Sequence, residues 1–317
     1  MLAYDASRAN RSSKTEPFIR SHRTTARGVL LLLAIGLTAG SAAARPLAAP
    51  KPRSVPTLIF PVVGSVYYQN DFGDPRGQGA HEGNDILAAW RSPVVAVEAG
   101  RIRLHTTSAR AGCMLYLYGD SGTTYLYIHL NNDVTKKRDN RGKCVAGTAY
   151  WKGIKDGQHV VAGQPIGYLG DSGDAEGTNH LHFEVHPNDG GAVNPFRYLS
   201  AAQRMLFVAP LGSTVTLSMS GTFASTTPGL MKLKVDVLRV LPGTTEVKKL
   251  ARSLVITVPP DALVQRTLAN GLAGGAITLA EARKGQKVTV LTAPVAATLD
   301  VELGRDGILS AAQVVLS

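Results

Sequence analysis

Apolar and polar residues alternate in short runs along most of this 317-residue chain. Between residues 57 and 199 these runs are VVAVEAG, MLYLYGD, TTYLYIHL, QHVVAGQPIGYLG and HLHFEVH, separated by glycine, proline, asparagine and aspartate. Successive side chains of a strand point to opposite faces, so a period of two predicts half-buried β-strands. We therefore predict an all-β fold, with a large antiparallel sheet in this region.

The alternation continues after Thr214, in the runs VTLSMSG, MKLKVDVLRV, SLVITV, KVTVLT, TLDVEL and QVVLS. No histidine or cysteine occurs after His186, and the last aromatic residue is Phe223. This pattern predicts a small β-barrel or β-sandwich domain over residues 212–317 that carries few reactive groups. The intervening stretch SAAQRMLF, residues 200–207, is expected to form one or two helical turns.

The first 44 residues have the pattern of a secretory signal. Six basic residues precede the apolar run 28–37, and the small residues SAAA at 41–44 fit a cleavage site. The run is short for a membrane span, so we expect removal and no stable membrane anchor. Residues 45–56 form a linker rich in proline and alanine. The remaining net charge of +7 suits an anionic polymer or ordinary solubility, and we expect no nucleic-acid partner.

Export bears on the two cysteines, Cys113 and Cys144, because disulfides persist outside the cytoplasm. We predict a bridge between them; the alternative is two unpaired thiols. The bridge would close a loop of about 31 residues and contribute roughly 3.5–4 kcal/mol by chain entropy. The polar, strandless segment 131–156 is predicted to be a surface insertion, and because it directly follows the run that ends at Leu130, we expect it to overhang a groove beside that run.

Two histidines share one face of the run HLHFEVH. His180 and His182 lie two residues apart, so on a strand their side chains point the same way, about 7 Å apart along the backbone. Two neutral imidazoles in one pocket are costly to bury unless their ring nitrogens have a hydrogen-bonding partner or bind a metal. A zinc ion is the usual answer in exported proteins.

A second candidate stretch is GAHEGNDILAA, residues 79–89. His81 and Asp85 are too far apart on an extended strand to share an ion, but Gly83-Asn84 supplies a turn that brings them together. With one imidazole from HLHFEVH they would make three ligands and leave a fourth position for water, the arrangement of catalytic zinc. On the residues alone, the alternative that Asp85 is an ordinary turn aspartate stays open.

The order of these motifs resembles a known family. H-x-G-x-D, Y-x-H-L and HLHFE, with the intervening SPVVAVEAGRI, DGQHVVAGQPIGYLGDSG and VNPFRYL, resemble the lysostaphin-like or LytM-type zinc metallopeptidases over about 140 residues. The resemblance implies a duplicated hybrid motif fold for residues 57–207 and one Zn²⁺ held by His81, Asp85 and His182. It also implies proton transfer and charge stabilisation by His129 and His180.

The resemblance leads us to predict a secreted, monomeric zinc endopeptidase that cleaves peptide bonds of peptidoglycan in the periplasm or cell wall. The alternative is an inactive module of the same kind that regulates other wall hydrolases. The run QHVVAGQPIG also resembles the hairpin of biotinyl and lipoyl carriers and of a phosphotransfer domain. We consider these functions a remote alternative, because the carriers need a lysine at the hairpin tip and the run has none. Glu184 is either a group that orients a histidine or a solvent-facing residue. We expect the remaining histidines to have no catalytic role: His105, His159 and His186.

Overall fold

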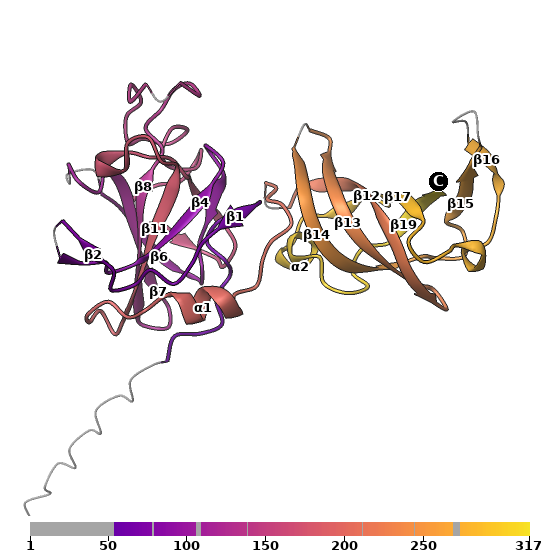
Figure 1. Cartoon of the computed structure of the whole chain (residues 1–317), viewed down its shortest axis with the longest axis horizontal. Helices are drawn as coiled ribbons and strands as arrows, with labels where there is room; N and C mark the ends of the chain where they lie inside the picture. The colour runs from indigo at the N-terminus through magenta and orange to yellow at the C-terminus, as the bar shows by residue number, and fades with distance from the viewer. Residues whose placement is uncertain are drawn as a thin grey trace, which may run out of the picture. The chain divides into compact units, whose positions relative to one another are not determined.

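The structure is a computed structural model that describes residues 54–317 except 78, 106–108, 138, 211, 244 and 269–272. The predicted signal peptide 1–44 and most of the linker 45–56 lie outside the described residues. Antiparallel strands dominate and the helices are short, so the all-β prediction is confirmed (Figure 1). Within the described ranges, no helix is long and apolar enough to cross a membrane.

A seven-stranded antiparallel sheet organises residues 66–187, and it places the motif strands side by side. The strand HLHFEVH is β11, and it lies between the strand that contains Asp85 and the strand that contains Tyr127. In spatial order the sheet consists of β1 (Val66–Tyr67), β4 (Asn84–Ala88), β11 (His180–Pro187), β8 (Thr123–Leu130), β7 (Cys113–Gly119), β6 (Gly100–His105) and β9 (His159–Val160).

The apolar face of this sheet forms the hydrophobic core. Leu181, Phe183 and Val185 of β11 are fully buried, and Phe183 packs against Tyr125 and Tyr127 of β8. Their alternation with polar residues explains why β11 buries one face and leaves the other for chemistry. Two short ribbons complete this part of the chain: β5 (Pro93–Val95) with β10 (Pro165–Tyr168), and β2 (Pro75–Arg76) with β3 (Gly79–Ala80).

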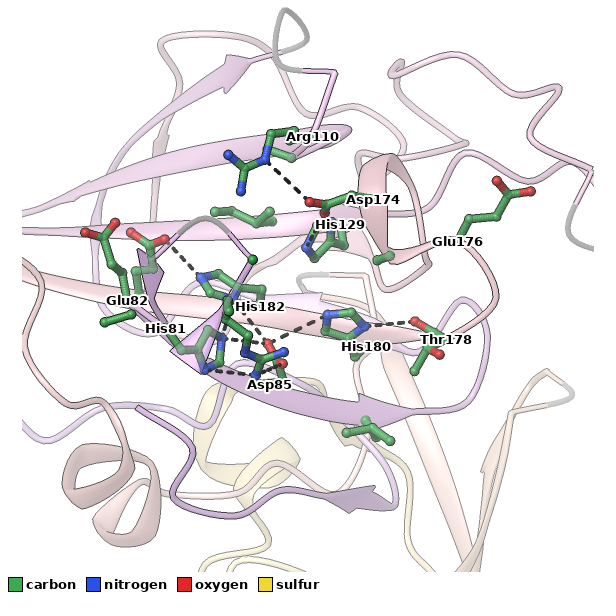
Figure 2. Close-up of a pocket in the computed structure, with 18 residues that line it drawn as sticks. His81, Glu82, Asp85, Arg110, His129, Asp174, Glu176, Thr178, His180 and His182 are labelled. Atoms are coloured by element: carbon green, nitrogen blue, oxygen red, sulfur yellow. Dashed lines mark hydrogen bonds and ion pairs between the residues drawn. The ribbon is translucent and has the colours of Figure 1, made fainter. Parts of the chain in front are cut away.

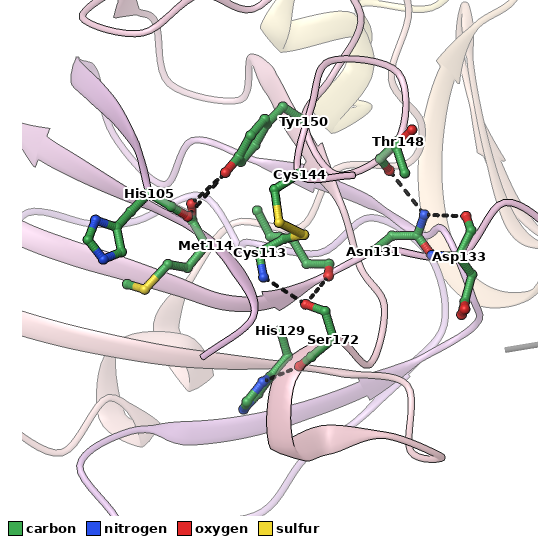
Figure 3. Close-up of a disulfide and its surroundings, with 11 residues drawn as sticks. His105, Cys113, Met114, His129, Asn131, Asp133, Cys144, Thr148, Tyr150 and Ser172 are labelled. Atoms are coloured by element: carbon green, nitrogen blue, oxygen red, sulfur yellow. Dashed lines mark hydrogen bonds between the residues drawn. A yellow bond between two sulfur atoms is a disulfide. The ribbon is translucent and has the colours of Figure 1, made fainter. Parts of the chain in front are cut away.

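The disulfide between Cys113 and Cys144 is present, as predicted (Figure 3). It joins β7 to the segment 131–156, which contains no strand in its described residues. Most described residues of this segment are exposed, as expected for a surface insertion, but a few of them anchor it to the core. Asp133 and Tyr150 are buried, and the Tyr150 hydroxyl donates to the carbonyl of Met114 at 3.0 Å. Tyr150 belongs to the hydrophobic core, so it anchors the segment there.

The strands after residue 212 form a separate eight-stranded sheet with its own hydrophobic cluster. β15 and β19 pair in parallel, and the other strand pairs of this sheet are antiparallel in its described residues. Thr257 bridges to Ser310, so the sheet curls back on itself; the choice between barrel and sandwich stays a prediction. The strands are β14 (Glu246–Thr257), β13 (Leu230–Leu241), β12 (Thr214–Thr227), β17 (Lys287–Thr292), β19 (Ala311–Leu316), β15 (Leu263–Thr267) and β16 (Ala273–Ala276), with β18 (Val295–Ala296) beside β12.

Two local predictions are wrong. The helix expected at 200–207 is α1 (Phe196–Ala201), which begins after Pro195, and the chain is extended from Ala202 onward. The run TLDVEL, expected as a strand, forms α2 (Leu299–Leu303). Thr298 caps its first turn by accepting from the backbone of Val301, and Gly304 ends it in the left-handed conformation. These end signals outweigh the alternating pattern.

Candidate metal centre

Three side chains from the two motif stretches converge on one face of the sheet (Figure 2). His81 Nε2 lies 2.8 Å from His182 Nδ1 and 3.1 Å from Asp85 Oδ1. His182 Nδ1 lies 3.1 Å from the same Asp85 oxygen. Around a tetrahedral zinc with bonds of about 2.0–2.1 Å, ligand atoms are roughly 3.3 Å apart. The triangle of donor atoms therefore fits one such ion.

Strand pairing brings these residues together. β11 and β4 are antiparallel neighbours, and His182 lies directly opposite Asp85. His81 is placed by the turn before β4, where its backbone N–H donates to Asp74 and its carbonyl accepts from Gly73. A Cβ at Gly83 would lie 2.6 Å from His182 Nε2. Only glycine therefore lets this turn approach the imidazole.

In both histidines of the triangle, the ring nitrogen that faces away from the triangle has an oxygen acceptor. His81 Nδ1 lies 2.8 Å from the carbonyl oxygen of Asp71, and His182 Nε2 lies 2.9 Å from Glu184 Oε1. Each far nitrogen therefore carries the proton, so the near nitrogen presents its lone pair toward the triangle. This network of neutral tautomers is the form of histidine that binds a metal.

Carboxylates around the triangle also favour protonated histidine when no metal is bound. Burial lowers the pKa of His182, but hydrogen bonds to Asp85 and Glu184 outweigh it and raise the pKa to about 9. Burial raises the pKa of Asp85, but hydrogen bonds to His182 and His81 more than compensate and hold it well below its usual range. The centre thus attracts positive charge, whether a proton or a cation.

His129 and His180 line the same groove beside the triangle, with their rings 4.9 Å apart (Figure 2). His129 Nδ1 donates to the carbonyl of Ser172 at 2.8 Å, and His180 Nδ1 donates to the carbonyl of Thr178 at the same distance. Both rings therefore use Nδ1 for a backbone carbonyl and keep Nε2 for other partners: His129 Nε2 lies 3.8 Å from Asp174 Oδ1, and His180 Nε2 lies 3.7 Å from Asp85 Oδ1. Burial, followed by the nearby His180, lowers the pKa of His129 to about 4, so His129 is neutral near pH 7.

His129 reaches the groove through an unusual backbone. Strict alternation would send it to the core with Tyr125 and Tyr127, but its φ of 63° turns it around. The register of β8 with β7 shifts between Cys113 and Leu115, opposite this residue. As a result both Ile128 and His129 line the groove. A non-glycine residue in this conformation is strained, which is common at functional sites.

The groove has a volume of about 670 Å³ and is open to solvent. Glu82, Arg110, Asp174 and Glu176 line its rim. None of the described residues of segment 131–156 lines it, so the predicted overhang is wrong. The Cys113–Cys144 bridge explains why, because it ties this segment to β7 instead.

Several residues of the site were missed by the sequence analysis. Arg76 Nη2 donates to Asp85 Oδ2 at 2.9 Å, and Asp71 accepts from His81. Both come from an irregular stretch without a periodic pattern. Glu184 does orient His182, and its second oxygen contacts His186 Nε2 at 2.7 Å. His186 therefore helps to position Glu184. The sequence contained a signal for this, because the alternation in HLHFEVH puts His186 on the same face as His182 and Glu184.

Comparison with known proteins agrees with the motif resemblance. Residues 145–195 match the model of peptidase family M23. The chain is 29% identical over 157 residues to the L-Ala–D-Glu endopeptidase of Bacillus subtilis, with 46% of this chain and 43% of that protein covered. The resemblance to lysostaphin-like, LytM-type peptidases is thus confirmed, and these matches support a peptidase. The chain spans less than half the length of this relative.

Two solved structures are also similar. The catalytic domain of the antimicrobial peptidase lysostaphin from Staphylococcus simulans is 26% identical, covering 42% of this chain and 90% of that one, with a TM-score of 0.32. A zinc-containing peptidase from Vibrio cholerae is 22% identical, covering 45% and 40%, with a TM-score of 0.33. At TM-scores this low, neither likeness carries an argument about the site.

Proposed function

We propose that this protein is a zinc endopeptidase that hydrolyses peptide bonds of bacterial peptidoglycan. One observation carries the proposal: two imidazole nitrogens and one carboxylate oxygen form a triangle with edges of 2.8–3.1 Å in an open groove, beside two further histidines. Three protein ligands with access for water are typical of catalytic zinc. A structural zinc site would enclose the ion with four side chains.

His81, Asp85 and His182 would hold the ion, and their far-side partners orient them. A zinc ion held by these three residues would supply Lewis-acid chemistry, by lowering the pKa of a bound water and polarising the scissile carbonyl. His129, neutral and aimed into the groove through Nε2, accepts the proton of the attacking water and returns it to the leaving amine. His180, whose ring centroid lies 4.9 Å from that of His129, would donate from Nε2 in its protonated form to the negative charge that develops on the carbonyl oxygen.

Peptidoglycan is the proposed substrate because the relative from Bacillus subtilis is named for a bond of that polymer's peptides. Export supports the same choice: the leader 1–44 has the signal pattern, and a disulfide is typical of proteins outside the cytoplasm. We propose a peptidase region over 57–207 and an accessory β-domain over 212–317, in a chain that acts as a monomer.

Digestion of purified peptidoglycan sacculi tests the activity. The mature protein with zinc should release new amino termini, and His182→Ala should abolish the release. Mass measurement of the fragments from defined muropeptides identifies the bond. Release of reducing sugar ends instead would indicate a glycosidase and contradict the proposal. If zinc binds but no amino termini appear, the regulatory alternative is favoured.

A further inference from the structure

The face of the sheet that carries the metal triangle continues well beyond the groove. Glu184 of β11 lies opposite Leu126 of β8, which lies opposite Tyr116 of β7, which lies opposite Arg103 of β6. Residues paired across neighbouring strands share a face. Glu184 already contacts the ligand His182, so this row of side chains leads directly from the site to Arg103.

A second row runs parallel to the first, two residues further along each strand. It passes from His186 through Thr124 and Tyr118 to Arg101. The two rows together place two tyrosines and two arginines on adjoining strands β7 and β6. We call the set Arg101, Arg103, Tyr116 and Tyr118 the aromatic–basic face.

Three of these four side chains are exposed, and Tyr116 is half-buried beside them. Tyr118 is 43% exposed, and both arginines are exposed. The rings of Tyr116 and Tyr118 are parallel within 6°, with centroids 6.1 Å apart. Among the described residues neither arginine forms an ion pair; Arg101 donates to the carbonyl of Gly157 at 3.0 Å. The face therefore combines two tyrosine rings with two exposed arginines that form no ion pair among the described residues.

The backbone beneath this face cannot bind a strand. β7 is paired on both sides, and so is β6, at least where β9 covers it. A peptide adding by main-chain hydrogen bonds needs a free strand edge. Recognition here must use side-chain faces, which suits a sugar ring: its axial C–H groups carry partial positive charge and contact the negative face of an aromatic ring.

The distance also suits a polymer that extends from the groove. Neighbouring strands lie about 4.8 Å apart, so the three steps from β11 to β6 span roughly 14 Å. This is more than one sugar residue and comparable with a disaccharide. A glycan attached to a peptide in the groove would therefore reach both tyrosines and place its acidic substituents near the arginines.

We propose that the aromatic–basic face binds the glycan strand of peptidoglycan while the attached peptide occupies the groove. This inference rests on the proposed function and extends it by assigning a second binding site. The tyrosine rings contact the sugar rings. Arg101 and Arg103 pair with carboxylates of the polymer, which gives the binding a dependence on salt.

Binding to insoluble sacculi tests the proposal, with the full chain in a His129→Ala background so that the polymer stays intact. Tyr118→Ala should raise the dissociation constant about five- to tenfold through loss of the ring contact. Tyr118→Phe keeps the ring and should bind like the parent. Arg103→Gln should weaken binding about threefold or more at low salt and less at high salt. Arg266→Gln, an exposed arginine after residue 212, is the matched control and should change nothing.

Competition identifies the ligand. Glycan strands stripped of peptide should displace the His129→Ala protein from the sacculi. Free stem peptides at the same concentration should not. Equal displacement by free peptides, or unchanged binding by Tyr118→Ala, would overturn the proposal. Failure of the proposed function is distinguishable, because it would appear as no release of amino termini by the chain with His129 intact, whatever the binding result.

Discussion

The carbonyl oxygen of Ser172 accepts a hydrogen bond from His129 Nδ1 at 2.8 Å, behind the groove (Figure 3). The hydroxyl of the same serine accepts from the backbone N–H of Cys113 at 2.9 Å and donates to the carbonyl of Leu130 at 2.5 Å. One buried serine thus connects the disulfide, the end of β8 and the proposed general base. It fixes both the tautomer and the position of His129.

Ser172→Ala should disturb this connection without removing the carbonyl that His129 uses. The N–H of Cys113 would be left unpaired in a buried position, so we expect a loss of about 1–3 kcal/mol in unfolding free energy. A displaced His129 should lower kcat about tenfold or more. Urea unfolding and steady-state kinetics measure the two effects. Ser220→Ala, whose half-buried hydroxyl contacts Thr289 in the other sheet, is the control for kcat.

Removing the disulfide should destabilise the protein and leave the metal ligands intact. The double change Cys113→Ser and Cys144→Ser frees a loop with a sequence separation of 31 residues. The chain-entropy model predicts a loss of roughly 3.5–4 kcal/mol. Thermal unfolding with and without reductant provides the measurement. A reductant that leaves the wild-type midpoint unchanged would contradict this role for the bridge.

Glu184→Gln should weaken zinc binding although Glu184 is not a ligand. The carboxylate accepts from His182 Nε2, and glutamine keeps an acceptor oxygen but loses the negative charge. Changes to such supporting groups typically cost about 10–100-fold in metal affinity. Competition with a coloured chelator measures the affinity. Glu176→Gln, an exposed carboxylate on the same groove, should retain full affinity.

His129→Ala should abolish most turnover while the metal remains bound. A positioned general base contributes about 10²–10⁴-fold, so kcat should fall by that factor. Zinc content should stay at the wild-type level, because His129 belongs to neither motif that supplies the triangle. A variant that lost zinc together with activity would instead assign His129 to the ligands.

Stability should depend on pH through Glu302 of α2. Burial raises the pKa of Glu302 from 4.5 to about 7, although a hydrogen bond from the N–H of Ala209 opposes this. The folded state therefore binds the proton more tightly than the unfolded state, and stability falls as pH rises from about 4.5 to 7. Glu302→Gln should remove this decline, so its stability relative to the wild type should be greatest above pH 7. Melting temperatures of both proteins from pH 5 to 8 test it; the exposed Glu281→Gln should keep the wild-type slope.

The proximity of His81, Asp85 and His182 was predictable only in part from local rules. Strand parity put His180 and His182 on one face, and a turn at Gly83 was needed to join His81 to Asp85. The strand order that places β4 beside β11 is not local, and it entered only through the family resemblance. That resemblance also carried His129, whose own parity indicated a place in the core.

Other features could not be predicted from an alternating pattern. The left-handed backbone of His129 depends on the register shift between β7 and β8. Arg76 and Asp71 contact the site from a segment with no period. In TLDVEL the alternation indicated a strand, yet Thr298 and Gly304 bound a helix there, because end signals decide short elements.

Metal content tests the central claim most directly. Purified protein, dialysed against zinc and then against buffer, should contain one zinc ion per chain by elemental analysis. His81→Ala, Asp85→Ala and His182→Ala should each reduce this to near zero, whereas His129→Ala should not. A wild-type chain without zinc, or ligand variants that keep it, would contradict the account.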